Sequence, residues 1–277
     1  MVVRELYRNI CDIIGQNPES DPRFEADQLI EFVTGKKRID VMNETLDETA
    51  VNRLTEYAQK RKNGYPLQYI IGKWQFFDMD LCVGEGVLVP RQDTETVCEA
   101  AFKVLKDIEN PIVIDLCSGS GCIALAVKRF FPQAEVTAVE KSEEAFAYLV
   151  KNTEGTGFAV NAVNGDILEF YKTVEDESVD VIISNPPYID YIFKPDLQAE
   201  VTHEPEMALF ADENGLFFYK FIAKHYYSKL KKGGYLVFEY GFDQQEQVRD
   251  IIKANGYTIV EEIIDMGINP RGVVAKK

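Results

Sequence analysis

A short polar stretch that follows an apolar run is the clearest sign of chemistry in this sequence. Val179–Ile183 is apolar and β-branched, which predicts a buried strand, and Asn185-Pro186-Pro187-Tyr188 follows it after one serine. Two prolines cannot continue a strand, so we expect a rigid turn at the carboxyl end, where open α/β sheets bind ligands. Asn185 Oδ1 and the Pro186 carbonyl could accept both hydrogens of one planar NH2 group, with Tyr188 stacked on its face. The alternative is a plain Pro-Pro turn in which Asn185 caps its own backbone.

A second candidate site is a glycine-rich loop that follows the predicted buried strand Ile112–Leu116. Asp115 lies in this strand, and the loop consists of Cys117, Ser118, Gly119, Ser120 and Gly121. Glycines in such a loop let a cofactor approach the backbone closely. The loop does not match the G-x-G-x-x-G pattern of dinucleotide-binding proteins, and proteins that bind NAD more often lack an aspartate at this place.

Acidic residues end or follow the next two predicted strands, 134–140 and 160–163. Glu140 could accept hydrogen bonds from two ribose hydroxyls. Asp166 could accept one from an adenine amino group, and Ile167 could cover the adenine face. Each acid alone would be an exposed strand end. Together with the glycine loop they indicate a dinucleotide or S-adenosylmethionine as the ligand.

A third segment, Val87–Thr96, leads into a predicted helix that continues to Leu105. Asp93 or Thr94 could cap this helix. Because the segment lies where a linker meets the second domain, we expect Arg91 and Glu95 to line a cofactor pocket. The alternative is a simple salt bridge of the linker.

The composition restricts the cellular setting and the partners. The chain has 277 residues, 46% of them hydrophobic, which suits one or two globular domains. The sequence has no apolar run near the ~18 residues of a membrane span and no signal peptide. Five cysteines without a C-x-x-C pair indicate reduced thiols and a cytoplasmic protein, and only two histidines argue against a metal site. A net charge of −16 argues against binding to a long phosphate backbone and suits a cationic cofactor or a basic partner.

The order of the predicted elements divides the chain into three parts. Residues 1–65 carry apolar residues at helical spacing, which predicts a small helical bundle that stabilises the chain or docks a partner. Residues 66–90 form a linker with a hairpin over about 69–83. Residues 91–277 alternate strands and helices, which predicts a parallel sheet covered on both faces. Late in this part we expect a helix over about 214–231, a turn at 232–234 and a strand over 235–240.

The motifs together resemble those of the Rossmann-like S-adenosylmethionine-dependent methyltransferases, in which Asn-Pro-Pro-Tyr occurs in enzymes that methylate a planar amide or amino nitrogen. One family is similar along the whole chain, the peptide-chain release factor glutamine methyltransferases (PrmC/HemK). The shared stretches are Pro66–Gly72, Val89–Glu95, Asn185–Ile189, Glu204-Pro205, Ala208-Leu209 and Gly215-Leu216. The resemblance implies an α/β fold: a seven-stranded class I methyltransferase domain at 91–277, preceded by a helical domain and a hairpin linker.

The resemblance also implies the reaction, which is methylation of the side-chain amide nitrogen of the glutamine in the Gly-Gly-Gln loop of release factors. Asn185, Pro186 and Tyr188 would act in catalysis, and Pro187 would join them in binding the substrate. The cofactor S-adenosylmethionine, which leaves as S-adenosylhomocysteine, would be held by Arg91, Thr94, Asp115, Cys117, Ser118, Gly119, Ser120, Gly121, Glu140, Asp166, Ile167 and Asn185. The expected partners are release factors, with no membrane and no nucleic acid, and the protein would be a monomer whose residues 1–65 dock the substrate.

Three alternatives stay open at this point. A methyltransferase of a ribosomal-protein glutamine would carry nearly the same motifs. An adenine-N6 DNA methyltransferase shares Asn-Pro-Pro-Tyr, but it would need a basic surface facing the DNA and a flipped base. A catalytically silent protein that only binds the cofactor is the third, and the intact Asn185 and Tyr188 argue against it.

The sequence departs from the family pattern at three positions. Cys117 stands where glycine is more usual, from which we expect an ordinary, negative φ at this residue. Gln92 stands where the family often has proline, and Glu140 replaces the commoner aspartate while remaining a bidentate acceptor. None of these departures removes a proposed chemical role.

Overall fold

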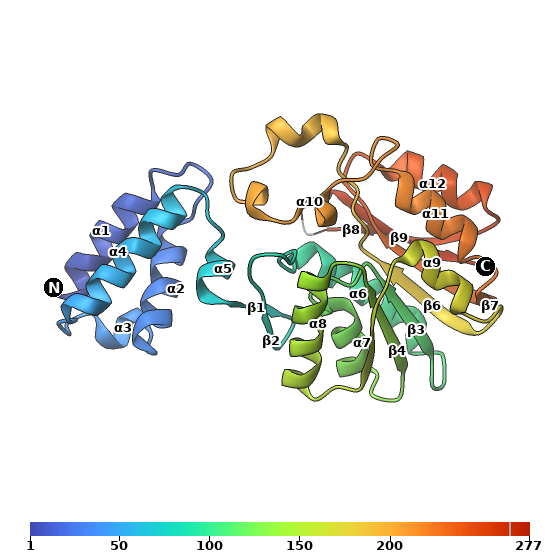
Figure 1. Cartoon of the computed structure of the whole chain (residues 1–277), viewed down its shortest axis with the longest axis horizontal. Coiled ribbons are helices and arrows are strands. Elements are labelled where there is room, and N and C mark those ends of the chain that lie inside the picture. The colour runs from blue at the N-terminus through green and yellow to red at the C-terminus, as the bar shows by residue number, and fades with distance from the viewer. Residues whose placement is uncertain (266) are drawn as a thin grey trace. The chain divides into compact units, whose positions relative to one another are not determined.

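The computed structural model describes residues 1–265 and 267–277, and the chain forms two compact units (Figure 1). The first, which we call the helical unit, comprises Met1–Lys73 together with Asp196–His203. The second, the sheet unit, comprises Trp74–Pro195 and Glu204–Lys277. No helix in the described ranges is long and apolar enough to cross a membrane.

The helical unit contains five helices within its described residues. They are α1 (Val3–Ile14), α2 (Pro22–Thr34), α3 (Arg38–Val41), α4 (Glu48–Lys62) and α5 (Leu67–Ile71). The apolar spacing predicted α1, α2 and α4. Helix α2 begins as expected, because the Asp21 carboxylate accepts the backbone N–H groups of Arg23 and Phe24, and Pro22 fills the first helical position. It ends at Gly35, whose φ of 70° is left-handed. Apolar side chains from α1, α2 and α4 fill the interior.

A buried ion pair fixes the end of α4 within this unit. The Arg61 guanidinium donates to both carboxylate oxygens of Glu25, at 2.8 and 2.9 Å, and also to the carbonyl of Tyr65. Arg61 is 2% exposed, so these acceptors compensate much of the cost of removing its charge from water.

The segment Asp196–His203 belongs to the helical unit although it lies between two parts of the sheet unit in the sequence. Its backbone N–H at Ala199 is bonded to the Glu19 carboxylate, and Glu200 lies 3.4 Å from Arg61. Gly64 lies so close to it that a Cβ there would come within 2.6 Å of Ala199 Cβ. The chain therefore crosses between the units three times.

The sheet unit begins with the short hairpin β1 (Lys73–Phe76) and β2 (Met79–Cys82), followed by α6 (Gln92–Leu105). The strands of its large sheet are β3 (Ile112–Leu116), β4 (Glu135–Glu140), β5 (Val160–Asn164), β6 (Val179–Ser184), β7 (Leu230–Glu239), β8 (Thr258–Ile264) and β9 (Pro270–Lys276). The helices between them are α7 (Cys122–Phe130), α8 (Glu143–Thr156), α9 (Ile167–Phe170), α10 (Glu206–Leu209), α11 (Phe217–His225) and α12 (Gln245–Ala254). Short 3-10 helices lie at Tyr171–Thr173, Tyr191–Asp196 and Val201–His203.

The strand order of the sheet is β5-β4-β3-β6-β7-β9-β8. Strands β3 to β7 pair in parallel, whereas β9 is antiparallel to both β7 and β8. The chain moves outward from β3 to β5 and then returns to place β6 on the other side of β3, so the topology reverses between β3 and β6. In that pair Leu116 is in register with Ser184, which brings the two loops that follow these strands together.

Each face of the sheet is covered by helices, as the alternation of elements predicted (Figure 1). Helices α6, α7 and α8 pack on one face around side chains such as Val113, Val136 and Val181. Helices α9, α11 and α12 pack on the other around Ile114, Ile182 and others. The seven-stranded α/β fold is confirmed.

Three boundaries differ from the predictions. The segment before the hairpin is helical at Leu67–Ile71, so strand structure starts only at Lys73. Helix α11 is shorter than expected. Residues 232–234, expected as a turn, lie inside β7, because the pairing with β6 shifts register between Val179 and Val181 and accommodates both glycines.

Candidate active site

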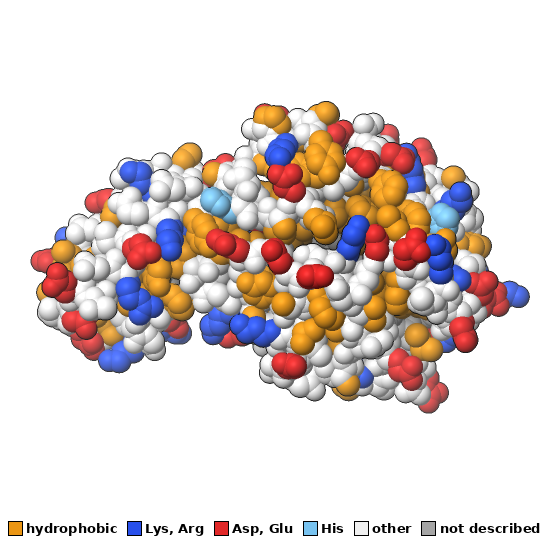
Figure 2. Space-filling view, viewed as in Figure 1, with side chains coloured by type: hydrophobic (Ala, Val, Ile, Leu, Met, Phe, Trp, Pro, Cys, Tyr) orange, Lys and Arg blue, Asp and Glu red, His pale blue; other side chains and the backbone are white. Residues whose placement is uncertain are grey.

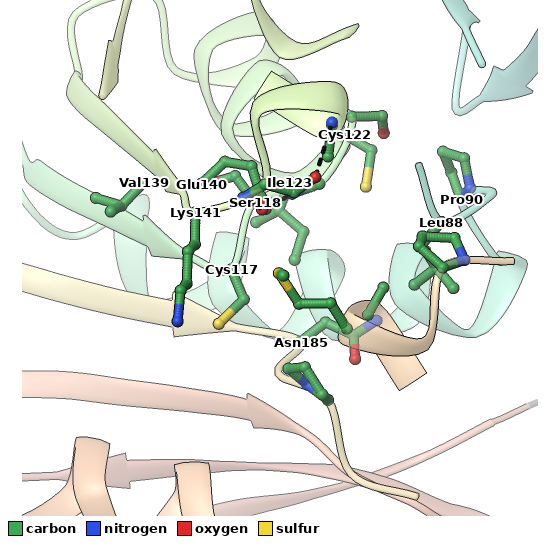
Figure 3. A pocket seen from close by; sticks show the side chains of 18 of the residues that line it. Leu88, Pro90, Cys117, Ser118, Cys122, Ile123, Val139, Glu140, Lys141 and Asn185 are labelled. Carbon is green, nitrogen blue, oxygen red and sulfur yellow. Dashed lines mark hydrogen bonds between the residues drawn. The ribbon is translucent and has the colours of Figure 1, made fainter. Parts of the chain in front are cut away.

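A pocket lies at the carboxyl end of β3, β4 and β6, where the topology reverses (Figure 3). The predicted site residues that line it are Arg91, Thr94, Cys117, Ser118, Gly119, Ser120, Glu140, Asp166, Ile167, Asn185 and Pro187. Further lining comes mainly from Leu88, Val89, Pro90, Val139, Lys141, Pro205, Met207, Ala208 and Phe218. The wall is thus mostly apolar, with polar groups gathered at the strand ends.

The glycine loop has one conformation that the sequence analysis did not expect. Cys117 has a φ of 62°, in the left-handed region, so the prediction of an ordinary φ at this position is wrong. The loop turns sharply after Leu116 and requires the geometry that glycine would adopt most easily, which a cysteine reaches at a cost of about 1–2 kcal/mol. Burial raises the pKa of the Cys117 thiol well above its usual range, which keeps the sulfur protonated.

The two glycines of the loop have different surroundings. A Cβ on Gly119 would meet nothing within 4 Å, and this residue lines the pocket. A Cβ on Gly121 would overlap the side chain of Leu149 in α8, and Gly121 is not among the lining residues. Gly119 therefore offers the close backbone approach, whereas Gly121 permits the packing of α7 on α8.

Glu140 holds the loop as well as facing the pocket. Its carboxylate accepts the backbone N–H of Gly119 at 2.8 Å and that of Ser142 at 2.7 Å. Burial raises the pKa of Glu140, while these backbone N–H groups lower it. Each carboxylate oxygen can accept a second hydrogen bond, so the predicted ribose contact remains compatible with this geometry.

Asp166 and Ile167 lie at the far end of the same wall. Asp166 caps α9 by accepting the N–H of Leu168 at 2.9 Å, and Lys141 lies 2.9 Å from its other oxygen. Ile167 is buried and offers an apolar surface. The pair could flank a flat heterocycle, as predicted.

Asp115 is buried beneath the loop and is not a lining residue. One of its oxygens accepts the N–H of Ala124 at 3.1 Å, and the other has no hydrogen-bond partner within the described part of the chain. Burial raises the pKa of Asp115 to about 7. Its position supports the loop and the start of α7, and its predicted role in cofactor binding stays a prediction.

The Asn-Pro-Pro-Tyr motif reaches the pocket through two of its four residues. Asn185 and Pro187 line it, and Asn185 lies across the pocket from Glu140 (Figure 3). Pro186 is buried, and Tyr188 packs against the core beside α11. Neither Pro186 nor Tyr188 is among the lining residues, and their roles toward the substrate stay predictions.

The start of α6 differs from the expected cap. Its N-cap is Arg91, which makes no side-chain cap, so the prediction of capping by Asp93 or Thr94 is wrong. The Thr94 hydroxyl donates instead to the Glu239 carboxylate at 2.7 Å. Glu239 is far from Thr94 in the sequence, so no local pattern reveals this bond. Glu95 is not among the lining residues, contrary to the prediction, and its carboxylate accepts the backbone N–H of Phe77 at 2.6 Å.

Arg91 forms an ion pair with a residue that the sequence analysis did not place in the site. Glu204 accepts from Arg91 at 2.6 Å and from the backbone N–H of Val89 at 3.0 Å. The Glu204 side chain is 1% exposed. It thereby holds the segment Val89–Arg91 as part of the pocket wall.

Glu204 and Glu239 are carboxylates at the site that sequence reasoning missed, and it also missed Lys141, which lines the pocket beside Asp166. Glu239 ends β7. The rule that selected Glu140, an acid at the carboxyl end of a parallel strand, would have found it. Glu204 has no such local pattern, although Glu204-Pro205 belongs to the shared stretches.

The pocket fits the predicted cofactor in its chemistry. S-adenosylmethionine combines an adenosine with a cationic amino-acid moiety. The wall offers carboxylates at Glu140 and Asp166, apolar cover at Ile167 and open space at Gly119. Carboxylate acceptors suit ribose hydroxyls and cationic groups alike.

Solved structures support the fold. A methyltransferase from Pyrococcus furiosus aligns with a TM-score of 0.53 at 21% identity, covering 73% of this chain and 90% of that one. The hMettl16 catalytic domain, solved with an RNA hairpin, aligns with a TM-score of 0.58 at 14% identity, covering 83% of this chain and 82% of that one. These likenesses concern the fold alone.

Sequence comparisons are more specific. The family model for the PrmC N-terminal domain matches residues 5–72, and the one for the methyltransferase small domain matches residues 94–210. The release factor glutamine methyltransferase of Salmonella typhimurium is 36% identical, covering 94% of both chains. That of Fusobacterium nucleatum is also 36% identical, over 99% of this chain and 78% of the relative. The chain therefore belongs to the release factor glutamine methyltransferase family.

Proposed function

We propose that this protein transfers a methyl group from S-adenosylmethionine to the side-chain amide nitrogen of the glutamine in the Gly-Gly-Gln loop of peptide-chain release factors. The observation that carries the proposal is the position of Asn185. It lies in the pocket wall directly after β6, across from the glycine loop and Glu140. Its side-chain oxygen is an acceptor that could take an N–H of a planar substrate amide.

The chain's own residues would act by positioning and electrostatics. An amide nitrogen is a poor nucleophile because its lone pair is delocalised into the carbonyl. Asn185 Oδ1 and the Pro186 carbonyl would each accept one N–H of the substrate amide, which orients the nitrogen and favours pyramidalisation as positive charge develops. The bound cofactor supplies an electrophilic methyl group on a cationic sulfonium. The apolar wall around Leu88, Pro90 and Ile167 would exclude water from the reacting groups.

The charge of the protein favours a protein substrate over DNA. The net charge is −16, and in Figure 2 acidic and basic side chains are interspersed over the visible face, without a large basic patch. A release factor with a basic surface would be attracted by this field. We propose accordingly that the enzyme acts in the cytoplasm as a monomer and has no nucleic-acid partner. The helical unit would dock the folded substrate, while glycines beside the glutamine would let the substrate backbone enter a narrow space.

The test uses a methyl-labelled donor and the intact protein. Purified release factor, ribosomal protein and duplex DNA are incubated separately, and mass spectrometry locates the label. We expect the label on the glutamine of the Gly-Gly-Gln loop and none on DNA. A release factor whose loop glutamine is replaced by glutamate is the matched control and should stay unlabelled. Label on another residue, or on the ribosomal protein at a higher rate, would overturn the substrate assignment.

A further inference from the structure

A hydrogen-bond network of three side chains leads from the pocket into the protein interior. The Glu239 carboxylate accepts from the Thr94 hydroxyl at 2.7 Å, and Asn185 Nδ2 donates to the same hydroxyl oxygen at 3.4 Å. Thr94 and Glu239 are each 2% exposed, so water hardly competes for these groups. The three residues come from α6, β7 and the loop after β6.

The hydrogen positions in this network follow from the ionised carboxylate of Glu239. A carboxylate only accepts, so the hydroxyl hydrogen of Thr94 must point at Glu239. The hydroxyl oxygen then has lone pairs free for the N–H of Asn185 and no hydrogen to offer it. The Asn185 amide is consequently turned with its nitrogen toward Thr94 and its oxygen away from it.

We propose that Thr94 and Glu239 are positioning residues which fix the side-chain amide of Asn185 with its oxygen toward the substrate nitrogen. The inference rests on the proposed function, because it explains why Asn185 presents an acceptor and not a donor to the substrate NH2. A flipped Asn185 would direct N–H groups at the N–H groups of the substrate. Glu239 and Thr94 do not touch the reacting atoms in this arrangement.

The ionisation state of Glu239 determines which groups donate and which accept in the hydrogen bonds of Glu239, Thr94 and Asn185. Burial is the largest cause that raises the pKa of Glu239; Asp93 also raises it and Thr94, Arg271 and Asn185 lower it, with a result of about 7. The titratable side chains Cys98, Cys122, Tyr188 and Tyr219 also face Glu239. When Glu239 is protonated it can donate to Thr94, whose hydrogen is then free to point at Asn185 and favours the flipped amide. Methyl transfer should therefore weaken as the pH falls through about 7.

The first test compares threonine variants in the intact enzyme. Thr94→Val keeps the shape and removes the hydroxyl, and we expect kcat on release factor to fall at least tenfold, with KM and cofactor affinity changed less than threefold. Thr94→Ser restores the hydroxyl and should recover most of kcat. Thr153→Val is the control for loss of a threonine hydrogen bond elsewhere, since Thr153 bonds the carbonyl of Leu149 in α8. Equal kcat for Thr94→Val and Thr94→Ser, or a loss confined to cofactor affinity, would overturn the proposal.

The second test follows the Asn185 side chain directly in the protein without substrate. The side-chain NH2 resonance of Asn185 in the ¹⁵N-labelled protein, identified by its absence from Asn185→Ala, should shift with a midpoint near pH 7. In Glu239→Gln the shift should be lost, together with the acidic limb of kcat. A resonance that does not titrate in the native protein, or that titrates equally in Glu239→Gln, would refute the assignment. Because the resonance measurement uses no substrate, it remains decisive even if the release factor is not methylated, which would count against the proposed function alone.

Discussion

Asn185 carries the reaction in the proposed mechanism, although its amide is an uncharged group without acid–base chemistry. Its value lies in geometry, since one oxygen at the right place orients a nitrogen and stabilises the positive charge that develops there. Such an effect should appear in kcat and leave cofactor binding nearly unchanged.

We expect Asn185→Ala to lower kcat about 10²–10³-fold, the range typical of one lost transition-state hydrogen bond, while calorimetry gives a cofactor Kd within about threefold of the native value. Asn161→Ala removes an exposed amide on β5 and serves as the control. Turnover of Asn185→Ala close to the native rate would exclude the mechanism.

Cys117 offers a second prediction at the residue scale. Its left-handed φ strains any residue with a Cβ and a β-branched residue most. Cys117→Val should have a free energy of unfolding about 1–3 kcal/mol below that of Cys117→Gly, measured by urea denaturation. Equal stabilities would mean that the loop can adopt another conformation at no cost.

At the scale of elements, the glycine loop joins a strand to a helix and does two separate tasks. Gly121→Val should lower the thermal midpoint, because the side chain would overlap Leu149 and φ is 83°. Gly119→Ala should mainly weaken cofactor binding, since its Cβ would project into open space, and the strain of its φ of 56° should lower the thermal midpoint less than Gly121→Val does. Calorimetry and thermal unfolding of both variants distinguish the two effects. Weaker binding with an unchanged midpoint in Gly121→Val would contradict the division.

The buried carboxyl of Asp115 beneath the same loop makes stability depend on pH. Its pKa is about 7 in the fold and about 4 in an unfolded chain. Between these values the folded protein holds a proton that the unfolded chain lacks, so stability falls as the pH rises from 4 toward 7, by up to about 4 kcal/mol. Asp115→Asn cannot ionise, and its stability relative to the native protein should increase between pH 5 and pH 8 in urea titrations. Parallel pH curves for the two proteins would rule this out.

The secondary-structure elements differ in how well the sequence predicts them. Strands β3 and β6 and the loops after them were predicted because apolar runs, glycines and prolines are local signals. The predicted cap of α6 is wrong because Thr94 donates to Glu239, a partner that no local pattern reveals. The predicted φ of Cys117 is wrong because the neighbouring residues of the loop impose a left-handed backbone there. Distant partners and imposed backbone angles are outside the reach of a single sequence.

At the scale of the whole molecule, the polypeptide chain itself connects the helical unit to the pocket wall. Asp196–His203 packs on Arg61 and Gly64, and the next residue, Glu204, holds Arg91 and Val89 in the pocket wall. A disturbance of the helical unit should therefore change the reaction as well as the proposed docking of substrate.

Gly64→Ala tests this connection, because the new Cβ would displace Ala199. We expect kcat to fall severalfold on both intact release factor and a short Gly-Gly-Gln peptide. Gly35→Ala is the matched control, since Gly35 also has a left-handed φ, 70°, but a Cβ there meets nothing within 4 Å. A rise in KM for intact release factor alone would restrict the helical unit to docking.

Because the chain passes between the two units three times, the helical unit is encoded by two separate stretches of the gene. Many two-part enzymes can exchange a domain by a single recombination, since each part is one continuous stretch of DNA. Here a crossover near codon 73 would supply a foreign bundle of helices and leave codons 196–203 behind, encoding a segment matched to the lost one. A productive hybrid needs both stretches to be replaced at once, so the bundle and the segment after the Asn-Pro-Pro-Tyr motif should descend together.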